Sequence, residues 1–141
     1  MRVMQDVAGS IVRALQRHPD VVVAYLFGSA ARGTSGPLSD IDVAVLLRED
    51  GHGLERRLSL MADLAEATKR ERIDVVILNE APVALAYRVL RDGRLLLSRD
   101  ERARVEHRVR TVDRYLDMEP FRRVQERGLR DRLSEGRFGR S

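Results

Sequence analysis

Two carboxylates stand where a buried strand is expected. Asp40 and Asp42 lie one residue apart at the start of an apolar run over residues 41–47. Because side chains alternate between the two faces of a strand, both carboxylates are expected to point to the same side. Two like charges held together need a cation between them, and Mg²⁺ or Mn²⁺ prefers such oxygen ligands. The pair therefore predicts a divalent metal site. The alternative, a turn in which Asp40 bonds to loop amides, accounts for Asp40 but not for Asp42.

A third carboxylate, Asp74, lies near the start of another apolar run over residues 72–79. If this run pairs beside the strand of Asp42, about 4.8 Å away, Asp74 can join the same cluster. It could then bind a second ion or accept a proton from an attacking hydroxyl. The alternative is an ordinary acid at a strand end beside Arg70 and Arg72.

A segment suited to phosphate precedes the first two acids. Gly28 and Ser29 follow a third apolar run over residues 21–27. Glycine lets the backbone approach a phosphate closely, and the serine hydroxyl adds a donor. Arg32 supplies a positive charge suited to phosphate oxygens, and Gly33 lets the chain turn back toward the acids. A phosphate-binding segment beside metal-binding carboxylates predicts an enzyme that catalyses phosphoryl or nucleotidyl transfer.

The elements that position these residues follow from the apolar spacing. Strands are expected at residues 21–27, 41–47, 72–79 and, at a sheet edge, 94–98. Helices are expected at residues 3–17, at 54–69 with Leu54, Leu58, Met61 and Ala65 as the apolar positions, at 82–92 with Gly93 just past the end, and from Asp100 onward. Pro120 is predicted to interrupt the last helix, with fraying beyond it. The alternation of strands and helices predicts an α/β or α+β sheet domain.

The length of 141 residues fits one domain over residues 1–98 and an arginine-rich helical extension, partly flexible, over residues 99–141. This extension contains 13 Arg and 9 acidic residues, so it carries the whole net charge of +4. Because acids and arginines interleave along a helical pattern, a solvated helix face is favoured over a nucleic-acid surface. With no tryptophan and 4% aromatic residues, binding of nucleic acid by base stacking is not expected.

The composition also bounds the compartment. The chain has no cysteine, which excludes disulfides and thiolate metal sites. Arg2, Asp6, Arg13 and Arg17 interrupt the N-terminal segment, so it has neither a signal-peptide core nor an apolar run of spanning length. We expect a cytoplasmic protein without membrane contact.

The spacing of these residues resembles a known signature. Gly28-Ser29, a gap of ten residues and Asp40-Ile41-Asp42 match the pattern of the DNA polymerase beta-type nucleotidyltransferase superfamily. Within it, the segments "FGSAARGTSGPLSDIDVAVLL" and "RIDVVILNEAPVALAYRVLRDGRLLLSRD" resemble the minimal nucleotidyltransferase (MNT) group, in particular MntA-like antitoxins. The resemblance covers roughly residues 1–105.

This resemblance implies a fold, an activity and a partner. The fold is a small mixed sheet flanked by helices, here with a C-terminal helical extension. Antitoxins of this group transfer AMP from ATP, with Mg²⁺, to a tyrosine of a HEPN-type ribonuclease toxin and form a hetero-oligomer with it. By position, the nucleotide would be bound by Gly28, Ser29, Arg32 and Gly33, and two Mg²⁺ ions, or Mn²⁺ in their place, by the catalytic carboxylates Asp40, Asp42 and Asp74.

Two other functions are compatible with the sequence. Nucleotidyl transfer to a small molecule such as an aminoglycoside usually requires a substrate-binding domain, for which residues 99–141 are too short and too charged. An antitoxin that acts by contact alone would use the basic extension as its interface.

The remaining histidines and tyrosines are expected to be structural. Surface or capping roles are predicted for the histidines, and core packing for the tyrosines. These residues are His18, His52, His107, Tyr25, Tyr87 and Tyr115.

Overall fold

The computed structural model describes the backbone of residues 2–28, 41–71 and 73–134 and the side chains of residues 6–28, 41–71 and 73–118. Within these ranges the helices and strands follow one another in the expected order. Their bounds are α1 (Arg2–Leu15), β1 (Val21–Phe27), β2 (Ile41–Leu47), α2 (Gly53–Thr68), β3 (Ile73–Ile77), α3 (Val83–Asp92), β4 (Arg94–Ser98) and α4 (Glu101–Ser134).

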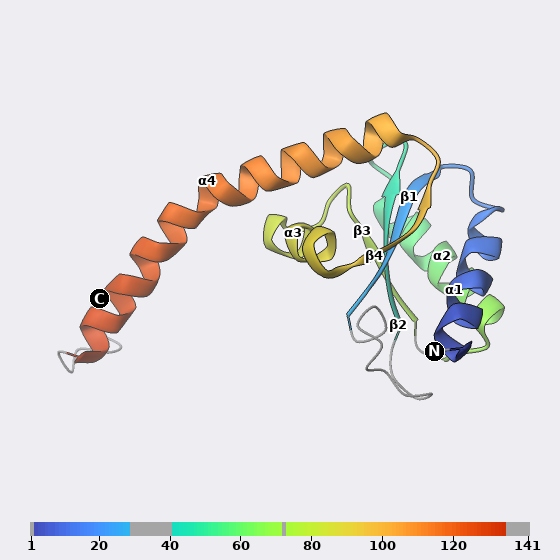
Figure 1. Ribbon diagram of the computed structural model, residues 1–141, viewed down its shortest axis with the longest axis horizontal. Coiled ribbons are helices and arrows are strands. Elements are labelled where there is room, and N and C mark those ends of the chain that lie inside the picture. Colours follow the sequence, from blue (N-terminus) through green and yellow to red (C-terminus); the bar gives the residue numbers. More distant parts are fainter. Residues whose placement is uncertain (1, 29–40, 72, 135–141) are drawn as a thin grey trace.

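The strands form one mixed sheet in the order β3-β2-β1-β4 (Figure 1). β1 pairs antiparallel with both β2 and β4, whereas β2 and β3 are parallel. β4 is an edge strand, as predicted, and β3 forms the other edge. The predicted α/β fold, a small mixed sheet flanked by helices with a further C-terminal helix, is confirmed.

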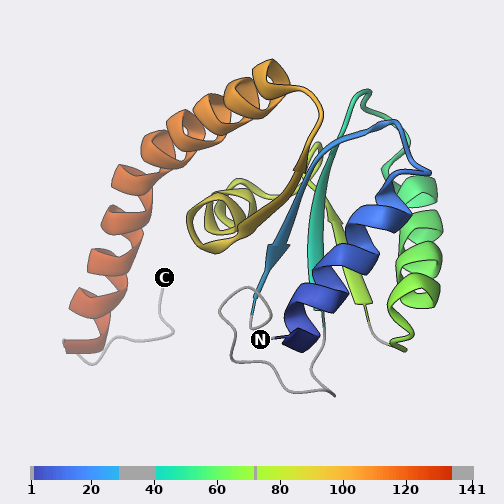
Figure 2. The same cartoon turned by 45° about the vertical axis from the view of Figure 1, so that its right-hand side comes forward.

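Helices cover both faces of the sheet. Figures 1 and 2 show α1 and α2 on one face and α3, with the beginning of α4, on the other. The first face is sealed by Ile11, Leu15, Leu60 and Leu64, which pack on alternate residues of β2 and β3. On the second face Ala86 and Val89 of α3 pack on the remaining strand positions. Because both faces are covered, the central strands are apolar nearly throughout, which is why the sequence showed runs rather than alternation.

The apolar face of α2 differs from the expected one. Leu54 and Leu58 are 67% and 56% exposed, whereas Leu60 and Leu64 are fully buried. Met61 and Ala65 are partly buried beside them. The predicted spacing identified the helix correctly but assigned the wrong residues to its buried face. Some leucines of α2 point toward the sheet and others toward solvent, so spacing alone did not distinguish them.

The prediction that Pro120 interrupts the last helix is wrong. α4 runs without a break from Glu101 to Ser134 and leaves the sheet domain behind, curving gently (Figure 1). A proline removes one intrahelical hydrogen bond and crowds the preceding turn, so it bends a long helix more readily than it ends one. None of the described helices has an apolar stretch long enough to cross a membrane.

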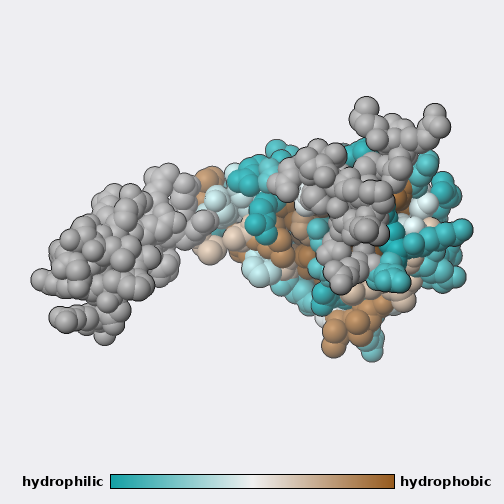
Figure 3. Space-filling model, turned by 90° about the horizontal axis from the view of Figure 1, so that it is seen from below, coloured by the Kyte–Doolittle hydropathy of each residue, from teal (hydrophilic) through white to brown (hydrophobic). Residues whose placement is uncertain are grey.

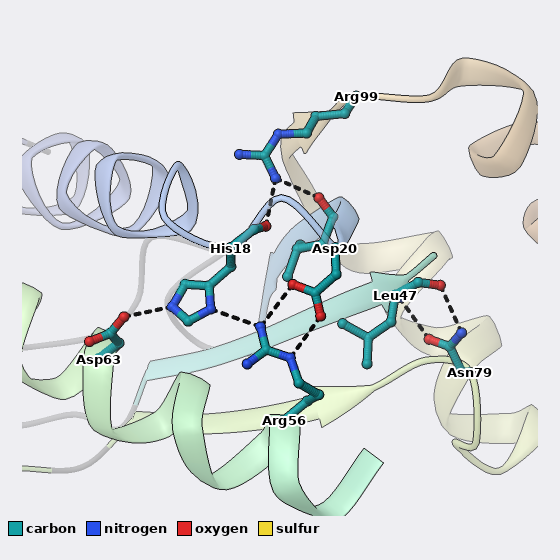
Figure 4. A network of polar contacts seen from close by, with 8 residues as sticks. His18, Asp20, Leu47, Arg56, Asp63, Asn79 and Arg99 are labelled. Carbon is teal, nitrogen blue, oxygen red and sulfur yellow. Dashed lines mark hydrogen bonds and ion pairs between the residues drawn. The ribbon is translucent and has the colours of Figure 1, made fainter. Parts of the chain in front are cut away.

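Two of the three histidines are buried, which corrects the expectation of surface positions. His18 is 8% exposed and belongs to a polar network between the end of α1, the start of β1, and α2 (Figure 4). Its Nε2 lies 2.6 Å from Asp63 Oδ2 and its Nδ1 lies 2.8 Å from Arg56 Nη2. Since the guanidinium can only donate, Nδ1 accepts and Nε2 carries the proton that Asp63 receives. His52, before α2, is exposed and caps nothing with its side chain.

Both aspartates of this network accept hydrogen bonds from basic side chains. Arg56 makes two hydrogen bonds to Asp20, at 2.7 and 2.8 Å. Burial alone would raise the pKa of Asp20, but the hydrogen bond and charge of Arg56 outweigh it, and the pKa is lowered. The hydrogen bond from His18 likewise lowers the pKa of Asp63. Arg99 closes this end of the domain by donating to three backbone carbonyls, those of Leu15, His18 and Val21.

Of the three tyrosines expected to pack in the core, only Tyr25 is a core residue, whereas Tyr87 and Tyr115 are partly exposed. Tyr25 on β1 is 6% exposed. Tyr87 of α3 and Tyr115 of α4 stack with ring centroids 3.8 Å apart and planes 3° from parallel. This stack fixes the position of α4 over α3, because two flat rings in contact define both a distance and an angle.

Candidate active site

Asp42 and Asp74 lie side by side at one end of the sheet. They are register partners on the parallel strands β2 and β3, at the second residue of each. The residues on either side of Asp42, Ile41 and Val43, are fully buried against α1 and α2. Because side chains alternate along a strand, both carboxylates point to the opposite face of the sheet, where they are half-buried.

Gly28, directly after β1, lies beside Asp42. Phe27 is the register partner of Asp42, so the chain turns away at Gly28 directly beside the carboxylate. The backbone of Gly28 has φ +77°, and an added Cβ would lie 2.6 Å from Asp42 Oδ2. Both the conformation and the space therefore require glycine. This gives a structural reason for the first residue of the Gly-Ser signature.

Arg57 binds Asp74 from α2 and was not identified from the sequence. Its Nη2 donates to Asp74 Oδ1 at 3.0 Å and its Nε donates to the carbonyl of Val75 at 2.8 Å. The amide of Val75 also donates to Asp74 Oδ1, at 3.0 Å. Oδ1 is thus held by two donors, and Oδ2 is the oxygen that remains for a ligand.

A sequence signal for Arg57 exists in hindsight. Arg57, Leu60 and Leu64 share one face of α2 by their spacing of three and four residues. The two leucines are fully buried, so a charged residue in line with them is unexpected unless it has a partner on the sheet. That signal was hidden by the wrong choice of buried face for α2.

The described part of the site is open to solvent. The side chains of Asp74 and Arg57 are 49% and 43% exposed. Figure 3 views the molecule from below, toward the end of the domain where β1 stops and β2 begins, and shows hydrophilic and apolar surface next to one another.

The donor chemistry fits a divalent cation. Asp42 and Asp74 offer hard carboxylate oxygens from adjacent strands, the ligand type that Mg²⁺ and Mn²⁺ prefer. Within residues 6–28, 41–71 and 73–118 no group of three or more histidine, cysteine or acidic side chains could hold a metal ion together. The described carboxylates are therefore a pair, and the predicted third ligand, Asp40, lies outside the described residues.

The structure brings together three of the predicted site residues, Gly28, Asp42 and Asp74. The other predicted residues lie outside the described part of the chain, so their assignment stays a prediction. These are Ser29, Arg32, Gly33 and Asp40.

Comparison with known proteins gives a family. Residues 10–102 match the family described as "Polymerase beta, Nucleotidyltransferase". This match spans more than half of the chain, so the protein belongs to this nucleotidyltransferase family. No curated protein matches the chain.

Solved structures of toxin-antitoxin complexes have the same fold. A chain from a toxin-antitoxin crystallised with AMP-PNP is 28% identical, with a TM-score of 0.75, over 86% of this chain and 97% of that one. A chain from the MntA-HepT toxin-antitoxin is 25% identical, with a TM-score of 0.70, over 89% and 97%. A chain from a tri-AMPylated Shewanella oneidensis HEPN toxin in complex with its MNT antitoxin is 25% identical, with a TM-score of 0.71, over 89% and 98%. The expected similarity to the MNT group is confirmed.

Proposed function

We propose that this member of the polymerase beta nucleotidyltransferase family is an antitoxin that transfers AMP from ATP to a tyrosine hydroxyl of a HEPN-type ribonuclease toxin. The transfer neutralises the toxin, and the two proteins form a hetero-oligomer in the cytoplasm. The proposal is supported by the family match and by the similarity to chains from complexes that contain AMP-PNP or an AMPylated toxin.

The observation that carries the proposal is the pairing of Asp42 with Asp74 beside Gly28. Parallel strands bring the two carboxylates into register, and the glycine leaves the space next to Asp42 free of any side chain. Like charges in register on adjacent strands repel each other, so an acidic pair with a close backbone approach serves transfer of a phosphate-linked group better than it serves protein folding.

Each residue has a role in the proposed reaction. Gly28 and Ser29 bind the triphosphate with backbone and hydroxyl donors, and Arg32 and Gly33 complete the loop. Asp40, Asp42 and Asp74 hold the divalent ions, which supply Lewis-acid stabilisation of the charge that develops on the triphosphate.

Asp74 has the second task of accepting the proton of the attacking tyrosine hydroxyl. Arg57 and the amide of Val75 hold its Oδ1, so this task falls to Oδ2. The bond that forms joins the tyrosine oxygen to the α-phosphorus of ATP, and pyrophosphate leaves.

The test is transfer of label from α-labelled ATP, with Mg²⁺, to the protein encoded beside this chain's gene. Asp42→Asn should lower labelling at least roughly 100-fold, because it removes a carboxylate charge at the reacting group without changing the size of the side chain. Asp113→Asn, on the exposed surface of α4, is the matched control and should label as the parent does. Label on a small molecule but not on that protein would contradict the proposal.

A growth assay separates catalysis from binding. The parent protein should rescue cells that express the toxin, and Asp42→Asn should fail to do so although it still copurifies with the toxin. If Asp42→Asn rescues fully, the antitoxin acts by contact and the proposed transfer is wrong.

A further inference from the structure

A cavity lies at the opposite end of the sheet from Asp42. It has a volume of about 360 Å³ and is bounded by the ends of β2 and β3, the start of α3, and α4. Its floor includes the apolar residues Leu46 and Leu78. Figure 2 shows α3 and α4 beside each other on this face of the sheet, and the stack of Tyr87 on Tyr115 joins them. The two helical walls are thereby held at a fixed separation.

The wall formed by α4 carries two arginines, Arg110 and Arg114. Both are exposed, and neither has an ion-pair or hydrogen-bond partner within the described side chains. Elsewhere on the same helix arginines are paired, as Arg102 is with Glu106 and Arg104 with Glu101. Asp50 also lines the cavity, and its carboxylate accepts a hydrogen bond from Asn79 at 2.7 Å. The cavity wall therefore has a surplus of positive charge.

A buried histidine lines the same cavity as these arginines. His107 is only 6% exposed. Its Nε2 lies 3.4 Å from Thr111 Oγ1, a long contact, and its Nδ1 has no partner within the described residues. No enclosed side-chain nitrogen or oxygen of the described residues lacks a partner, so Nδ1 is not enclosed and can contact a molecule in the cavity that His107 lines.

The opposite wall is the start of α3. Pro82 is its N-cap residue and makes no side-chain capping bond. Ala81 and Val83, on either side of this proline, line the cavity. The first amides of a helix have no intrahelical acceptor, and the helix dipole places partial positive charge there. The start of α3 therefore brings amide donors and partial positive charge next to residues that line the cavity.

We propose that this cavity is a second ligand site, which binds the phosphate group of a small molecule. Arg110 and Arg114 neutralise the oxyanion, and the amides at the start of α3 and the ring of His107 donate hydrogen bonds to it. Inorganic phosphate and a phosphate monoester share this chemistry. Because β2 separates the cavity from Asp42 by several residues, the site is distinct from the proposed catalytic centre and does not depend on its function.

The experiment is an NMR titration of the full chain labelled with ¹⁵N-histidine, with inorganic phosphate in one arm and AMP in the other, at constant ionic strength set by chloride. The ring resonances of His107 should shift with saturation at about 1 mM ligand or below, equivalent to a binding free energy of about −4 kcal/mol or stronger. Tighter binding in the phosphate arm would identify free phosphate as the ligand, and tighter binding in the AMP arm would identify a phosphate monoester.

Two double variants of equal charge test the assignment. Arg110→Gln with Arg114→Gln should weaken binding at least about tenfold, because both charged donors to the oxyanion are lost. Arg102→Gln with Arg108→Gln removes the same charge from residues of α4 that do not line the cavity, and should retain binding. If the His107 resonances do not move in either arm, or if both double variants lose binding equally, the proposal is overturned.

Discussion

The two ends of the sheet differ in how their charged side chains are arranged. Where β1 stops and β2 and β3 begin, Asp42 and Asp74 stand together on adjacent strands. At the opposite end Asp20 accepts hydrogen bonds from Arg56, and Asp63 accepts one from His18. Arg110 and Arg114, which have no partner within the described side chains, line a cavity at the same end. A pair of acids thus lies at one end of the sheet and a pair of arginines at the other.

The difference shows how the same residue types serve structure or chemistry. An aspartate with a guanidinium on both oxygens, such as Asp20, closes a gap between elements. Within the described residues, Asp74 accepts hydrogen bonds at Oδ1 alone, from Arg57 and an amide, and its side chain is half exposed. Whether a carboxylate is available for a ligand depends on how many of its oxygens the fold already uses.

The largest expected effect comes from the contact between Gly28 and Asp42. Gly28→Ala should nearly abolish nucleotidyl transfer, because the new Cβ would displace the Asp42 carboxylate, and the positive φ should cost about 1–3 kcal/mol of stability. Gly51→Ala is the matched control, since Gly51 has φ +100° but open space around it. It should lose similar stability in a denaturant titration and keep its transfer activity. Equal loss of activity in both variants would show that strain, not the carboxylate, is responsible.

A smaller effect is expected at Arg57. Arg57→Met should lower kcat for transfer roughly tenfold with little change in the KM for ATP, because Asp74 loses a donor that orients its carboxylate. Arg48→Met, an exposed arginine at the other end of β2, should leave both constants unchanged. A higher kcat for Arg57→Met than for the parent would instead mean that the Arg57 guanidinium hinders the role of Asp74 in the reaction.

The opposite end should respond to pH. The pKa of Asp63 is lowered from 3.8 by the hydrogen bond from His18, so the native state favours the charged carboxylate. This stabilisation is present above pH 3.8 and is lost as the pH falls through the lowered value. As the pH is lowered from 5, the unfolding free energy of the parent should therefore fall more than that of Asp63→Asn. The difference between the two decreases should be up to about 1 kcal/mol.

The control for this measurement is Asp113→Asn, which changes an exposed aspartate of α4. Its acid titration, followed by circular dichroism in urea, should have the slope of the parent. Identical slopes for Asp63→Asn and the parent would mean that the contact between His18 and Asp63 contributes nothing to folding.

The smallest effect, a change in stability, is expected for an exposed residue of α2 away from both ends of the sheet. Leu58→Gln should change the unfolding free energy by no more than about 0.5 kcal/mol, since the side chain is 56% exposed. Leu60→Ala, two residues on, should cost about 2–5 kcal/mol because it leaves a cavity against the sheet. Similar losses in both variants would contradict the orientation of this helix.

Much of the fold was predictable because the central strands are covered on both faces. The runs at residues 21–27 and 41–47 gave β1 and β2 with their observed bounds. The acids of the site stood out because they interrupt such runs. Arg57 and His107 could not be found in the same way, since a single charged or polar residue on a helix is ordinary until its partner on another element is known.

The sequence by itself determined the strands, the Gly-Ser and Asp-x-Asp spacing and the presence of each helix, because these depend on local periodicity and on residue type. Only the tertiary structure decided which faces are used. It placed Asp74 beside Asp42 through the parallel pairing of β2 and β3, turned Leu54 and Leu58 of α2 outward, and buried His107 against α3. Such outcomes depend on contacts between residues far apart in the chain, which no local pattern contains.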